Sequence, residues 1–178
     1  MAHLATCYCD IVFAQEETVT SDREVATALS RYCAYLVAFL PEFLPGDRLK
    51  TKTALEDVLQ EAHRLLRSPM SMEEKLTRIQ GLQLPQNENW LSTFQKGVKL
   101  GRQLEKLDTL VRWKVMAEFW AETILHAAPS DNAIAHIERL AKGGEFITHL
   151  WALLSNAGIL KRAADEQQET PQPAVDIV

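Results

Sequence analysis

Apolar residues recur at intervals of three or four along this chain, and this spacing restricts the fold more than any other feature of the sequence. The alternation of apolar and polar residues that marks a half-buried strand is not convincing in any segment. The clearest helical face runs through Trp113, Met116, Ala117, Trp120, Ile124 and Ala127. We therefore predict an all-α fold, a single compact bundle of about seven or eight helices joined by short loops.

Three of these helices are predicted to begin at a capping box, in which a Ser or Thr side chain and a Glu three residues later bind the first free amide groups. The pairs are Ser21 with Glu24, Thr53 with Glu56, and Ser71 with Glu74. The four tryptophans, at positions 90, 113, 120 and 151, fall on apolar faces, so we predict that they belong to the core.

The length of 178 residues suits one domain with a tail. We predict a helical domain over residues 1–163 and a disordered acidic tail over residues 164–178, because the tail has four acidic and no basic residues. The whole chain has a net charge of -5; the tail contributes -4, which leaves -1 for the domain. Such a domain offers no electrostatic reason to bind nucleic acid, and no nucleic-acid partner is predicted.

The three cysteines, at positions 7, 9 and 33, form no C-x-x-C pair and are predicted to be reduced thiols of a cytoplasmic protein. The longest uncharged run covers the fifteen residues 146–160. A membrane-spanning helix needs about 20 apolar residues, so no transmembrane segment is predicted in this chain.

Two patterns of charged residues are candidate sites. Glu118, Glu122 and His126 repeat every four residues, and Glu145 and His149 have the same spacing, so a carboxylate and an imidazole could share a metal or a hydrogen bond. We favour hydrogen bonds and predict no metal, no cofactor and no catalytic residue. A basic stripe could instead contact an anionic membrane surface or RNA, or be a solvated face; it consists of Lys96, Lys99, Arg102 and Lys106.

The pair Gly143-Gly144 is predicted to end one helix in the left-handed conformation, with the next helix following at once. Glu145 would then lie in the first turn of the new helix, where a carboxylate is favourable. His149, one turn later, would share its face and hydrogen-bond to it.

Residues 112–160 resemble the closing signature of a plant family called domain of unknown function 594. The pattern is W-x6-W-x-E-x5-A-P, followed by H-x-x-x-L-A-x-G-G-E-F-x-T-x-L-W-x-L-L-x-x-A-G. The matching signature residues include Trp113, Trp120, Pro129, His136, Gly143, Gly144, Glu145, Phe146 and Trp151. Weaker matches are the His-Leu-Ala-Thr sequence at residues 3–6 and the segment 30–45.

The resemblance implies the C-terminal domain of plant membrane-associated proteins, whose members usually have a multi-helix membrane region ahead of this domain. It implies no established activity. We therefore predict a non-enzymatic protein-interaction module with an unknown protein partner, cytoplasmic and associated with the cytoplasmic face of a membrane through its relatives. A metal-dependent enzyme built on the Glu/His cluster and a peripheral membrane-binding module remain as alternatives.

Overall fold

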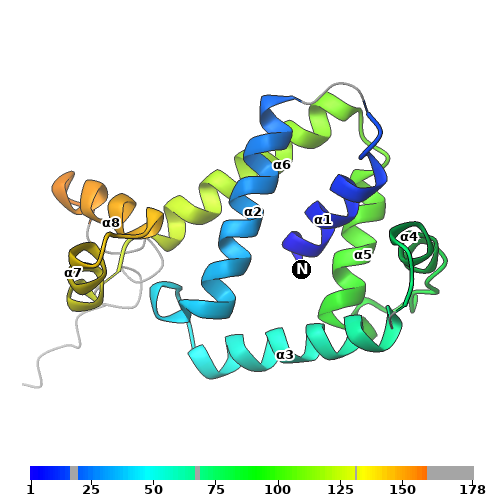
Figure 1. Cartoon of the computed structure of the whole chain (residues 1–178), viewed down its shortest axis with the longest axis horizontal. Helices are drawn as coiled ribbons and strands as arrows, with labels where there is room; N and C mark the ends of the chain where they lie inside the picture. Colours follow the sequence, from blue (N-terminus) through cyan, green and yellow to red (C-terminus); the bar gives the residue numbers. More distant parts are fainter. Residues whose placement is uncertain (17–19, 67–68, 131, 160–178) are drawn as a thin grey trace, which may run out of the picture. The chain divides into compact units, whose positions relative to one another are not determined.

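The computed structural model describes residues 1–16, 20–66, 69–130 and 132–159 (Figure 1). Over these residues the chain forms eight α-helices and two short 3-10 helices and no strand, which confirms the all-α prediction. The α-helices are α1 (Ala2–Val12), α2 (Ser21–Phe39), α3 (Arg48–Leu65), α4 (Met72–Gln80), α5 (Thr93–Leu104), α6 (Thr109–Ala127), α7 (Ala133–Ala141) and α8 (Phe146–Asn156), and the 3-10 helices are Pro41–Phe43 and Glu88–Trp90. The predicted tail, 164–178, lies outside the described residues.

Residue contacts divide the chain into two compact units that meet inside α6. The first unit, Met1–Thr123, contains α1 to α5 and most of α6. The second unit, residues 124–178, contains the end of α6 together with α7 and α8. Because one helix continues across the boundary, the division alone does not decide whether residues 1–163 form a single domain, and that statement stays a prediction.

Helix α1 is the central helix of the first unit and packs against both α2 and α5 (Figure 1). Two glycines bring α1 and α5 close together. A Cβ at Gly101 would lie 2.7 Å from the ring of Tyr8, and a Cβ at Gly97 would lie 2.7 Å from the Cβ of Leu4. The Tyr8 hydroxyl also donates a 2.7 Å hydrogen bond to the Glu105 carboxylate just beyond α5. Burial and this bond raise the pKa of Tyr8 to about 12.

The N-terminal part of α6 completes the core of the first unit. Trp113 is fully buried, and Trp120 is nearly so. The Trp120 indole N–H donates to the Thr6 hydroxyl at 3.0 Å, and the Arg23 guanidinium lies 5.2 Å from the centre of a Trp113 ring. The core prediction is confirmed for these two tryptophans. The buried cluster consists of Tyr8, Cys9, Ala26, Trp113, Met116, Ala117 and Trp120.

The core prediction is wrong for Trp90, whose surface is 76% exposed. This residue ends a 3-10 turn before α5, so it does not continue the apolar face of that helix. Trp151 is only partly buried.

Two of the three predicted capping boxes are also wrong. Helix α2 is capped by Thr20 and α3 by Asp47, which places Ser21 and Thr53 inside their helices. The Ser71 box of α4 is confirmed, with both reciprocal hydrogen bonds present. A further box, Ser92 with Gln95, begins α5.

No helix among the described residues is both long enough and apolar enough to cross a membrane. The three cysteines carry free thiols. Burial raises the pKa of the Cys9 thiol to about 12 and that of Cys33 to about 11. Both thiols are therefore protonated at neutral pH, and neither has the low pKa of a reactive cysteine.

Candidate functional site

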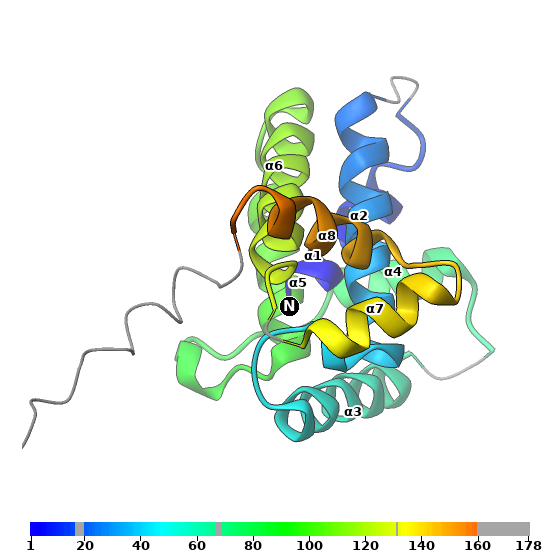
Figure 2. The same cartoon turned by 90° about the vertical axis from the view of Figure 1, so that its left-hand side faces the viewer.

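Helices α7 and α8 form a hairpin in the second unit, and its turn is made by two glycines (Figure 2). Gly143 has φ of 105° and Gly144 has φ of 77°, so both adopt the left-handed region that penalises other residues. The Gly144 N–H donates to the carbonyl of Arg139 at 2.9 Å, which closes the end of α7. The predicted left-handed stop is confirmed.

Glu145 caps the start of α8. It is the N-cap residue, one position before the first turn in which it was predicted. Its N–H donates to the Thr148 hydroxyl at 2.9 Å, and that hydroxyl donates to the Glu145 carbonyl at 2.7 Å. The Glu145 carboxylate is paired with the guanidinium of Arg139 on α7. The sequence did not indicate this ion pair, which joins the two arms of the hairpin.

An aromatic stack fills the inside of the hairpin. The imidazole of His136 on α7, which is fully buried, lies parallel to the Trp151 ring on α8. The ring centres are 4.6 Å apart and the planes differ by 11°. The Trp151 indole N–H donates to the carbonyl of Ser130 at 3.2 Å, which fixes the chain before α7. His136 and Trp151 therefore position the hairpin.

These contacts involve six residues of the closing signature: His136, Gly143, Gly144, Glu145, Thr148 and Trp151. The comparison with protein families matches residues 105–159 to a family described as "Protein of unknown function, DUF594". Residues 105–159 are thus similar to that family. The resemblance seen at residues 112–160 is confirmed over that range, whereas the weaker matches near residues 3 and 30 stay predictions. No curated protein and no solved structure matches the chain.

Residues 105–159 also carry exposed apolar side chains that helical periodicity did not indicate. On α7, Ile134 and Ile137 are 73% and 59% exposed, and on α8, Phe146 and Leu153 are 48% and 65% exposed. Each pair points away from the side of its helix that carries His136 or Trp151, because the buried positions of both helices lie on the other face. We call these four residues the hairpin outer residues.

The Glu/His cluster does not assemble as a site. Glu118, Glu122, His126 and His149 are exposed to solvent, and Glu145 is engaged by Arg139. Within residues 1–16, 20–66, 69–130 and 132–159, no group of three or more His, Cys, Asp or Glu side chains is arranged to hold a metal ion.

Two members of the basic stripe have structural partners. Lys99 is paired with the Glu88 carboxylate. Arg102 donates to the carbonyls of Ile79, Gln80 and Leu82 at 2.8 to 2.9 Å and so holds the end of α4 against α5. The Glu88 carboxylate offsets the charge of Lys99, and the Arg102 side chain is held by backbone carbonyls of the same unit.

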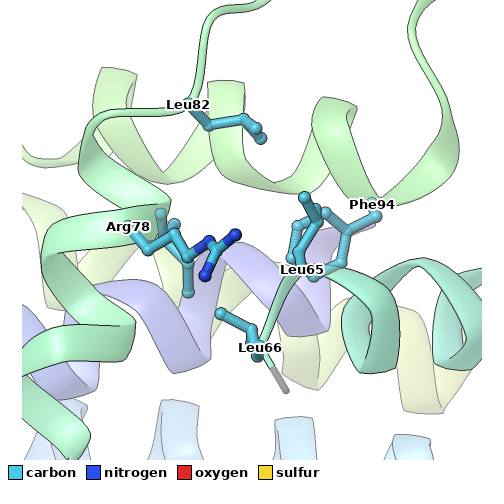
Figure 3. Close-up of a pocket in the computed structure, with 6 residues that line it drawn as sticks. Leu65, Leu66, Arg78, Leu82 and Phe94 are labelled. Carbon is cyan, nitrogen blue, oxygen red and sulfur yellow. The ribbon is translucent and has the colours of Figure 1, made fainter. Parts of the chain in front are cut away.

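The hollows of the first unit offer little to a ligand. One lies between the ends of α3 and α4 and the start of α5, with Leu65, Leu82 and Phe94 around it (Figure 3). Its volume of about 10 Å³ admits at most one water molecule. The other, of about 320 Å³, is an open depression lined by Asp57, Gln60, Glu61 and Arg64, all from α3.

Proposed function

We propose that this chain is a non-enzymatic helical interaction module that binds a protein partner through the hairpin outer residues. The observation that supports the proposal is the exposure of four large apolar side chains on two short neighbouring helices. Signature residues on the facing sides of the two helices, His136 and Trp151 among them, hold the hairpin together. Large exposed apolar side chains are a feature of many protein interaction sites.

The location of the partner is part of the same proposal. The resemblance to domain of unknown function 594 favours a plant protein at the cytoplasmic face of a membrane, attached through relatives or neighbouring segments. The enzymatic and peripheral-membrane alternatives gain no support from the arrangement of the Glu/His cluster or from the basic stripe, so we do not pursue them as functions.

The test compares the wild type with three variants by quantitative recovery of bound proteins from plant tissue. Ile137→Asn and Leu153→Asn each place a polar side chain among the hairpin outer residues. Leu49→Asn makes the same change on α3, where Leu49 is 71% exposed. We expect proteins that bind the wild type to be retained by Leu49→Asn and lost by the two hairpin variants, with unchanged helical circular dichroism in all three.

Recovery of the same proteins by all forms would refute binding through the hairpin. Stoichiometric zinc, iron or manganese in the purified wild type would instead favour the metal-dependent alternative.

A further inference from the structure

The outward side of α6 in the first unit carries a second apolar surface, separate from the hairpin. Val111, Val115 and Phe119 are 50%, 45% and 46% exposed. Their spacing of four residues aligns them in one ridge along the helix, opposite the ridge of Trp113, Met116 and Trp120 that faces the core. We call these three exposed residues the α6 ridge.

Two opposite charges flank the α6 ridge on the neighbouring row of side chains. Lys114 and Glu118 are both largely exposed, and their charged atoms are 3.9 Å apart, at the outer limit of an ion pair. Such a loose surface pair contributes little stability, so either side chain is free to take another partner.

We propose that a second copy of this chain covers the α6 ridge. The two α6 helices run antiparallel, and the two-fold axis passes between them at the level of position 116 along each helix. Four-residue ridges are the rows that interdigitate most often when two helices pack. An axis at this position places Val115 of each copy between Val115 and Phe119 of the other.

The same axis makes the charges complementary. Residues equally far from position 116 face each other, so Lys114 of each copy meets Glu118 of the other, twice in the dimer. In a parallel two-fold pair the rows that carry Lys114 and Glu118 would lie on opposite sides of the interface, so these charges would not meet and would give no attraction. The self-complementary charge order thus favours a second copy in this orientation over an unrelated apolar partner.

Charge reversal tests both the occupant and the orientation. In Lys114→Glu the dimer contains only acidic side chains at these positions, and in Glu118→Lys only basic ones. We expect each variant to raise the dimer dissociation constant at least tenfold in sedimentation equilibrium at low salt, where surface charges are least screened. An equimolar mixture of the two variants should associate about as tightly as the wild type, because lysine faces glutamate again at both contacts.

Two controls complete the design. Lys142→Glu, an exposed lysine of the second unit, should leave the dissociation constant unchanged. Val115→Ser should weaken the dimer without altering charge. A wild type that stays monomeric over the whole concentration series, or charge variants that fail to associate when mixed, would overturn the proposal. The result is independent of the hairpin, since Ile137→Asn is expected to dimerise like the wild type.

Discussion

Different kinds of contact stabilise the interior of the first unit and the interior of the second unit. In the first unit, bulky apolar side chains fill the space between α1, α2 and α6, and two glycines let α5 approach α1 directly. In the second unit, specific polar and aromatic contacts join two short helices: an ion pair, a parallel ring stack and a pair of left-handed glycines. The difference teaches that some residues of the family signature, such as His136 and Trp151, form the contacts that hold a small hairpin together.

The largest expected loss of stability follows from the core of the first unit. Trp113→Ala should lower the free energy of unfolding by about 3–5 kcal/mol, because it leaves a cavity where a fully buried indole was. Trp90→Ala, at an exposed tryptophan, is the matched control and should change stability by less than about 0.5 kcal/mol. Urea unfolding followed by circular dichroism measures both. Equal losses at the two positions would contradict the assignment of the core.

A smaller loss is expected at the contact between α1 and α5. Gly101→Ala should cost about 1–3 kcal/mol, because the new methyl group would lie within 2.7 Å of the Tyr8 ring and force the two helices apart. Alanine is otherwise the better helix former, so a gain in stability would show that the helices separate easily.

Substitutions in the glycine turn of the second unit should lower stability through backbone strain. Gly143→Ala and Gly144→Ala should each cost about 1–2 kcal/mol, the penalty of a left-handed residue with a Cβ. A Cβ at Gly144 would also lie 2.5 Å from Nε2 of His149, but this is the end of an exposed side chain that can move. Thermal unfolding should therefore show a similar loss of stability for Gly144→Ala in the wild-type protein and in the His149→Ala variant. A much smaller loss of stability in the His149→Ala variant would indicate that His149 is held rigidly against Gly144.

The smallest effect concerns pH. Burial lowers the pKa of His3 below 6.5, with a further contribution from the Met1 amino group and Arg31, while the hydrogen bond to Ser30 acts in the opposite direction. Folding therefore favours neutral His3, and the unfolded chain takes up the proton first. This contribution to stability is fully present above about pH 6.5 and is lost as the pH falls toward the folded pKa. In denaturant titrations, His3→Gln should show a weaker acid dependence than the wild type between about pH 7 and pH 5.

The success of sequence interpretation follows from the range of the interactions involved. The α6 stripe, the Ser71 box and the glycine turn were predicted because each depends on residues a few positions apart. The starts of α2 and α3 were misplaced because a neighbouring Thr20 and Asp47 compete for the same role, and both are good cap residues. The position of Trp90 and the carbonyl contacts of Arg102 depend on segments that meet only in the folded chain, so helical periodicity could not indicate them. In the hairpin, the signature contains His136, Glu145 and Trp151, but their contact partners became visible only in three dimensions.

The central position of α1 has a consequence for the order of events during synthesis. Among the helices described, α1 is synthesised first, yet its main neighbour, α5, begins at Thr93. The hydrogen bond from Trp120 to Thr6 joins residues that are 114 positions apart. At about 5–20 residues per second, α1 spends roughly 5–20 s as a short amphipathic segment without its main neighbour. An isolated helix of this length is marginal in water. The nascent chain must therefore keep this segment from premature association until the second half of the first unit has emerged.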